Sequence, residues 1–264
     1  VGIAEEHAVG LASGLAKRGL KPVVAVYSSF LQRSLDQIIH DVALQKINVV
    51  FAIDRAGVVG SDGPTHHGVF DVGFLRMVPG MVCMAAADGA ELEAMVDKSF
   101  EFSCPVSIRY PRGKTTQDRE KVVIETGKSF VCREGKDVVF FCLGPMKEQG
   151  LEASDILAKE GISAGVVSAR FIKPLDTEFL LSLVGKVKVV CTVEDNVLSA
   201  GFGSAVLEFY QEQKVLDKVL LLSYGFPDEF VVAGERDQLF AQYGLDAQSL
   251  AGKVKQAFKG LPGI

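Results

Sequence analysis

A glycine-rich segment at residues 54–68 concentrates side chains that can bind anions and move protons. It carries Arg55, Asp62, His66 and His67 among four glycines and one proline. The apolar run before it predicts a strand over residues 47–53, so the segment starts at a strand's carboxyl end. Polar groups on a long glycine-rich loop rarely serve packing. We therefore expect a binding or catalytic loop here.

Two adjacent carboxylates, Glu5 and Glu6, stand at the start of a helix predicted over residues 5–18. Acids in a first helical turn commonly compensate the helix dipole. The alternative is that one carboxylate points into a pocket and exchanges a proton. Neighbouring helical positions differ by about 100°, so both cannot point to the same place.

Tyr27 and Phe30 follow a second predicted strand, over residues 21–27, and open a helix predicted over residues 29–45. In open α/β sheets, ligands bind outside the carboxyl ends of the strands. The two rings could form a flat apolar wall there, or they could be core aromatics.

A pair of arginines, Arg109 and Arg112, closes a third predicted strand at residues 105–109. Guanidinium groups flanking Pro111 suit a phosphate or a carboxylate, whereas a lone pair of arginines is more often a solvated surface. Three candidate sites at three strand ends of one sheet make a shared functional site the better interpretation.

Several function classes are not supported by the sequence. The net charge of −5 gives no electrostatic footprint for nucleic acid, and no apolar run is long enough to span a membrane. The five cysteines form no CxxC pair, and His66-His67 lacks the spacing of zinc ligands, so we expect no metal site. The partial GxGxxG at residues 201–206 lacks its third glycine, which argues against a dinucleotide site.

Short β-branched runs alternate with helical patterns along the whole chain, which is typical of α/β proteins. We expect two three-layer α/β/α domains with mainly parallel sheets, the second sheet mixed. The first domain is predicted at residues 1–115, a polar linker at 116–130 and the second domain at 131–264. Further elements are expected as strands at 81–86, 137–143, 162–168, 187–193 and 217–223, and as helices at 70–77, 89–102, 146–160, 176–184, 202–213, 235–242 and 247–259.

Four motifs together resemble the 1-deoxy-D-xylulose-5-phosphate synthases, which are transketolase-like thiamine-diphosphate enzymes. They are GIAEEHA at 2–8, YSSFLQR at 27–33, AIDRAGVVGSDGPTHHG at 52–68 and RYPRG at 109–113. In the second domain, RFIKPLD at 170–176 and VEDNVLSAGFGSAV at 193–206 look like that family's transketolase-type C-terminal domain. The resemblance covers essentially the whole chain.

The resemblance implies roles for single residues near the cofactor. Glu5 matches the glutamate that hydrogen-bonds N1′ of the thiamine aminopyrimidine, and it is the residue expected to be catalytic there. Phe30 matches the ring that stacks on the pyrimidine, with Tyr27 and Arg33 beside it and Ile3 as a pocket wall. Glu6 receives no catalytic role.

It also implies roles around the substrates. Arg55 and an arginine of RYPRG match the groups that receive the substrate phosphate, with Arg112 preferred to Arg109. Asp62 and His66 match catalytic polar residues near the reacting carbon, which steer the acceptor aldehyde and relay protons.

The implied reaction joins pyruvate to D-glyceraldehyde 3-phosphate with loss of carbon dioxide. Its product, 1-deoxy-D-xylulose 5-phosphate, feeds isoprenoid, thiamine and pyridoxal synthesis. The resemblance further implies a homodimer in the bacterial cytoplasm or a plastid, with thiamine diphosphate and Mg²⁺ as cofactors.

The family anchors Mg²⁺ and the diphosphate with a GDG motif in an N-terminal domain, and this chain has no GDG. We therefore expect a C-terminal fragment that is inactive alone. Two alternatives stay open. One is a split transketolase C-terminal subunit or the β-subunit of a 2-oxo acid dehydrogenase, and the other is a non-catalytic paralogue or docking module.

Overall fold

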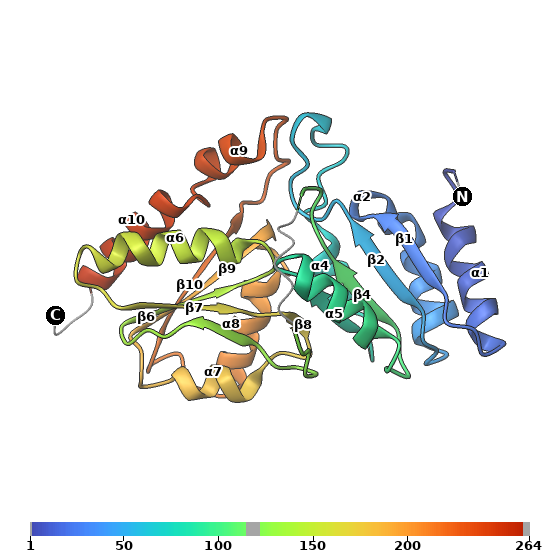
Figure 1. Cartoon of the computed structure of the whole chain (residues 1–264), viewed down its shortest axis with the longest axis horizontal. Helices are drawn as coiled ribbons and strands as arrows, with labels where there is room; N and C mark the ends of the chain where they lie inside the picture. Colours follow the sequence, from blue (N-terminus) through green and yellow to red (C-terminus); the bar gives the residue numbers. More distant parts are fainter. Residues whose placement is uncertain (1, 115–121, 261–264) are drawn as a thin grey trace.

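Two α/β units, each built on a five-stranded sheet, make up the computed structural model, which describes residues 2–114 and 122–260 (Figure 1). The strands are β1 (Val23–Tyr27), β2 (Val50–Asp54), β3 (Val82–Ala85), β4 (Val106–Arg109), β5 (Phe130–Arg133), β6 (Val138–Cys142), β7 (Ala164–Ser168), β8 (Phe171–Lys173), β9 (Val189–Val197) and β10 (Leu220–Phe226). This confirms the predicted α/β class.

The first sheet has the strand order β1-β2-β4-β3-β8, with every pairing parallel except that of β8. Its register sets Tyr27 beside Asp54, and Ile53 beside Arg109. The carboxyl ends of β1, β2 and β4 are therefore neighbours on one edge of the sheet. This is the edge where parallel α/β sheets bind ligands.

Helices cover both faces of the first sheet because residues of a strand point alternately to opposite sides. Phe51 and Ile53 face a cluster that includes buried residues of three helices, α1 (Glu5–Lys17), η2 (Ile38–Ala43) and α4 (Asp71–Arg76). Met84 and Ile108 face the other side, where Met95 of α5 (Gly89–Ser99) packs.

The second sheet has the order β10-β9-β6-β7-β5, with only β5 antiparallel. One face carries α6 (Met146–Ala158) and α10 (Ala247–Lys259), and the other carries α7 (Thr177–Leu183) and α8 (Phe202–Glu212). A shorter helix, α9 (Arg236–Tyr243), precedes α10. All five residues of β6 are buried, as expected for a central strand covered on both sides.

The predicted order of strands and helices is confirmed, with three differences. The helix predicted at 29–45 is a series of short turns: α2 (Ser28–Leu31), η1 (Gln32–Ser34), α3 (Leu35–Gln37) and η2. Strand β9 continues four residues beyond the predicted 187–193. Strands β5 and β8 were not predicted, and residues 116–121 of the predicted linker lie outside the described residues.

Strand β8 joins the two units, because it lies in the second half of the chain yet pairs with β3 of the first sheet. Beside it, Arg170 donates from Nε to Glu91 Oε1 at 2.8 Å, and both side chains are buried. One continuous apolar cluster also contains buried residues of both units, from Val9 to Val219. The two units therefore share a core.

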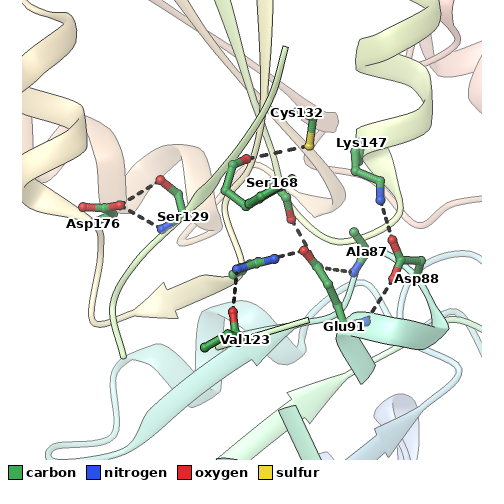
Figure 2. Close-up of polar contacts among 11 residues, drawn as sticks. Ala87, Asp88, Glu91, Val123, Ser129, Cys132, Lys147, Ser168 and Asp176 are labelled. Carbon is green, nitrogen blue, oxygen red and sulfur yellow. Dashed lines mark hydrogen bonds and ion pairs between the residues drawn. The ribbon is translucent and has the colours of Figure 1, made fainter. Parts of the chain in front are cut away.

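The junction carries further polar contacts around the start of α5 (Figure 2). Glu91 Oε2 accepts hydrogen bonds from the backbone N–H of Ala87 at 3.0 Å and from the hydroxyl of Ser168 at 3.3 Å. Asp88 caps α5 by accepting from the Glu91 N–H, and it pairs with Lys147 of α6 at 2.5 Å. A carboxylate of one unit is thus satisfied by donors of the other.

Glu194, in the middle of β9, is fully buried and caps the start of α8. Its carboxylate accepts from the backbone N–H groups of Phe202 at 2.7 Å and Gly203 at 2.8 Å. Burial raises the pKa of Glu194 to about 7, although those hydrogen bonds lower it.

Within the described ranges, no helix is long and apolar enough to cross a membrane.

The substitution Glu91→Gln tests the junction. It leaves the buried Arg170 guanidinium without a countercharge, so the free energy of unfolding should fall by about 3 kcal/mol or more. The matched change Glu101→Gln removes the half-exposed pair with Lys98 and should cost about 0.5 kcal/mol or less. Chemical denaturation of both variants measures the difference, and equal losses would contradict a junction held by the buried pair.

Glu194 also predicts a pH dependence of stability. Between pH 4.5, the ordinary pKa, and about 7, the folded chain keeps a proton that the unfolded chain has lost. The free energy of unfolding should therefore decrease as pH rises through this window, by up to about 1.4 kcal/mol per pH unit from this group. Glu194→Gln should flatten the decrease, whereas exposed Glu212→Gln should keep it. Identical slopes in all three proteins would refute the assignment.

Candidate active site

The predicted site residues gather at the carboxyl edge of the first sheet. Tyr27 and Asp54 are the last residues of β1 and β2, and their Cα atoms are register partners. Arg109 ends β4 on the far side of β2. The adjacency expected from three separate sequence motifs is therefore present in the fold.

Glu5 lies at the first turn of α1 and lines a cavity of about 320 Å³. The residue is 5% exposed, while Glu6 is exposed to solvent. One carboxylate oxygen, Oε1, lies 3.5 Å from Arg33 Nη1. The other, Oε2, is buried and has no hydrogen-bond partner among the described residues. Of the two adjacent acids, the one that enters a pocket is Glu5.

Phe30 lines the same cavity as Glu5 and stands at the centre of a group of planar side chains. Its ring stacks on Tyr27 with centroids 5.3 Å apart, and His66 meets it edge-on at 5.4 Å. The Arg33 guanidinium lies 5.3 Å from the Phe30 centroid, and that of Arg55 lies 3.7 Å from the Tyr27 centroid. Stacking and cation–π contacts thus link the cavity to the loop after β2.

The loop after β2 is closed at its neck by two glycines. Gly57 and Gly68 exchange backbone hydrogen bonds of 2.7 and 2.8 Å. A Cβ on Gly57 would lie 1.9 Å from Asp195 Oδ2, and one on Gly68 would lie 2.3 Å from the Arg55 carbonyl oxygen. Only glycine fits at either position, so the neck fixes where the loop begins and ends.

The second unit holds the loop from the other side (Figure 1). His67 is buried, accepts from the Val59 N–H at Nδ1, and lies 3.0 Å from the Val232 carbonyl oxygen through Nε2. The Val58 N–H donates to Asp195 at 3.1 Å. His67 therefore positions the loop and leaves His66 as the histidine near the cavity.

Near the tip of the loop, the side chains of Asp62 and His66 each contact a polar side chain of a described residue. Arg112 Nη1 donates to Asp62 Oδ2 at 3.2 Å, which ties the loop to the segment after β4. His66 Nδ1 lies 2.9 Å from the Thr65 hydroxyl. Among the described residues this leaves Nε2 of His66 as the nitrogen available for proton exchange.

A second cavity, of about 510 Å³, lies beside this loop. Its lining includes the arginines Arg55, Arg112 and Arg236 together with Lys114. Arg55 has a left-handed φ of 57°, and its guanidinium is anchored by Asp54 at 2.6 Å. A residue held in a sparsely populated conformation at a binding cleft is typical of functional sites. Guanidinium groups from both halves of the chain make this cavity suited to an anion.

Arg109 does not face this cavity, which corrects its place among the expected phosphate ligands. It is 3% exposed, donates to both oxygens of Asp71 at 2.8 and 3.3 Å, and contacts the carbonyl oxygens of Gly68 and Asp195. As the last residue of a central strand, it is covered by the loop and by β9. Its N–H groups connect the end of β4 to the loop after β2 and to β9.

Ile3 is likewise not a wall of the first cavity. It is 87% exposed, whereas Gly2 lines the cavity. Residues 2–4 precede α1, and Gly2 has a φ of 64°, a left-handed conformation, so the chain enters the helix with the Ile3 side chain turned to solvent.

Two features of the site had not been predicted. Arg236 lies more than a hundred residues beyond RYPRG, at the start of a helix, and no motif surrounds it. Asp54 was part of the loop motif but had no assigned partner.

The parts of the chain that the structure describes contain no group of three or more acidic, histidine or cysteine side chains that could hold a metal ion.

Comparison with known proteins agrees with this architecture. The model of the transketolase pyrimidine-binding domain matches residues 1–117, and that of the transketolase C-terminal domain matches residues 127–250. A solved structure titled as a split-gene transketolase, inactive β4 tetramer, has a TM-score of 0.88 at 32% identity and covers 98% of this chain and 83% of its own.

The most similar curated sequences include 1-deoxy-D-xylulose-5-phosphate synthases. That of Caldanaerobacter subterraneus subsp. tengcongensis is 49% identical over 100% of this chain and 42% of its own length. That of Syntrophotalea carbinolica is 49% identical over 97% of this chain and 40% of its own length. The chain thus spans about two-fifths of the length of the relatives it matches. It belongs to the transketolase family, and within that family its sequence groups with the 1-deoxy-D-xylulose-5-phosphate synthases.

Proposed function

We propose that this chain forms part of an enzyme that condenses pyruvate with D-glyceraldehyde 3-phosphate in a thiamine-diphosphate-dependent reaction. Carbon dioxide is released, and the product is 1-deoxy-D-xylulose 5-phosphate, a precursor of isoprenoids, thiamine and pyridoxal. The observation that carries the proposal is the buried, half-satisfied carboxylate of Glu5 in one cavity with the Phe30 ring.

The first cavity fits the aminopyrimidine half of thiamine. Glu5 Oε2 is a buried oxygen without a hydrogen-bond partner among the described residues, and a ring nitrogen is a suitable partner for it. Phe30 offers an aromatic face next to that carboxylate. When bound, thiamine diphosphate supplies the electron sink for decarboxylating pyruvate. We propose that Glu5 shares a proton with N1′ and that Arg33, 3.5 Å from Oε1, stabilises the carboxylate when the proton lies on the nitrogen.

We propose that the second cavity receives the phosphate of the acceptor. Arg55 is oriented by Asp54 and stacks on Tyr27, while Arg112 is held by Asp62 at the rim. Anchored guanidinium groups bind phosphate with two parallel N–H donors and lose little freedom on binding. His66 meets the edge of the Phe30 ring, which lines the first cavity, and would relay the proton at the reacting carbon.

We further propose that this chain supplies only the pyrimidine-binding half of the cofactor site. The sequence contains no GDG motif of the kind with which the family anchors Mg²⁺ and the diphosphate. The cation Mg²⁺ and the homodimer remain part of the proposal for the whole enzyme, with the diphosphate bound outside this chain.

A second candidate function is that of a stand-alone C-terminal transketolase subunit. The split-gene transketolase, of which this chain covers 83%, supports it. The higher identity to the synthases, 49%, and the fit of YSSFLQR and RYPRG favour the synthase.

The donor substrate separates the two functions. The enzyme assembled with its diphosphate-binding part should release carbon dioxide from pyruvate in the presence of D-glyceraldehyde 3-phosphate. It should not transfer a two-carbon unit from a ketose phosphate at a comparable rate. A coupled assay with each donor decides, and a preference for the ketose donor would replace the synthase with the transketolase subunit.

Substitution of Glu5 by Gln tests the proton-holding role. An amide of equal size cannot hold the proton, so kcat of the assembled enzyme should fall at least about 100-fold. The neighbouring Glu6→Gln changes an exposed carboxylate of the same helical turn and should leave kcat within about twofold. Steady-state assays measure both, and equal kcat values for the two variants would remove Glu5 from the mechanism.

A further inference from the structure

The second cavity is lined by residues of both units, and its cationic lining does not end with Arg55 and Arg112. Arg236, the first residue of α9, comes from the second unit. Pro145 and Glu148, at and just after the start of α6, belong to the same lining. The second unit is therefore part of the wall of the cavity that the proposed function assigns to the acceptor phosphate.

Arg236 is positioned by two contacts, neither of which is a hydrogen bond. Its Nη2 lies 3.6 Å from Asp195 Oδ2, which is an ion pair but longer than a good hydrogen bond. The ring of Phe240, one helical turn later, lies 5.0 Å from its guanidinium carbon. In the described part of the chain, Arg236 Nε and Asp195 Oδ2 are both buried without a hydrogen-bond partner.

The contrast with Arg109 shows why this matters. Arg109 is 3% exposed and spends its donors on Asp71 and two carbonyl oxygens. The Arg236 side chain is 32% exposed at the cavity wall, and its contact with Asp195 is an ion pair that forms no hydrogen bond. Arg109 therefore has a structural role, whereas Arg236 retains N–H donors for a ligand.

The charges around the cavity also favour a dianion. The lining holds three acids: Asp54 is paired with Arg55, Asp88 is paired with Lys147, which reaches it from α6, and Glu148 is the third. Arg112, Lys114 and Arg236 add three cationic groups to the lining. A phosphate monoester would meet donors from the loop after β2, from the segment after β4 and from α9.

We propose that Arg236 is a third binding residue for the acceptor phosphate, and that the second unit thereby takes part directly in substrate selection. This inference rests on the proposed function for the identity of the acceptor. It adds a role for the C-terminal unit that depends on one side chain.

The test measures binding of inorganic phosphate and of glycerol 3-phosphate to the full 264-residue chain, by NMR titration of the arginine Nε–H signals. Arg236→Gln should weaken binding by about tenfold or more, as expected for losing one charge-assisted contact. Arg236→Lys should recover part of the loss because it keeps the charge. Arg18→Gln, at the exposed end of α1, should bind as the unaltered chain does. Thermal unfolding checks that each variant is folded.

In the assembled enzyme, Arg236→Gln should raise KM for D-glyceraldehyde 3-phosphate about tenfold or more. KM for pyruvate and the rate with unphosphorylated D-glyceraldehyde should stay within about twofold. A merely structural role would change all three together, and that result would overturn the inference.

The binding outcomes distinguish failure of the inference from failure of the proposed function. If Arg236→Gln binds phosphate normally while Arg112→Gln does not, the inference is wrong and the phosphate cavity stands. If the unaltered chain binds neither probe, both the inference and the phosphate assignment are wrong.

Discussion

A carboxylate removed from water must accept hydrogen bonds or hold a proton. The candidate site is built around a buried carboxylate in which only one of the two oxygens has a polar partner. Glu5 is buried at the start of α1, with Arg33 beside one oxygen and no hydrogen-bond partner for the other among the described residues. Such an arrangement is costly for an unliganded chain. It is explained if a ligand completes the site, and the adjacent Phe30 ring indicates a flat ligand.

The parallel register of the first sheet brings the other groups to Glu5. With β2 between β1 and β4, the segments that follow all three strands meet on one edge. The second unit then fixes the loop after β2, through His67 and Asp195, and shares a core with the first unit through β8. Residues of both units therefore hold the loop that carries Asp62 and His66.

Much of the fold could be predicted because buried parallel strands are continuous apolar runs, which the sequence shows directly. The grouping of Phe30, Arg55 and His66 followed from motifs at strand ends, whereas the place of Glu5 beside them followed from the resemblance to the synthases. Strands β5 and β8 were missed because short antiparallel strands at sheet edges lack that signal, and β8 pairs with a strand about ninety residues earlier. The roles of Arg109 and Arg236 could not be predicted, because the partners of a guanidinium depend on tertiary contacts. Arg109 is paired with Asp71, whereas Arg236 lines the second cavity.

The most direct test of this account is a crystal structure of the assembled enzyme with thiamine diphosphate. The account predicts that N1′ of the aminopyrimidine lies within hydrogen-bond distance of Glu5 Oε2 and that the pyrimidine stacks on Phe30. A pyrimidine bound outside this cavity, or an N1′ that faces a residue other than Glu5, would contradict it.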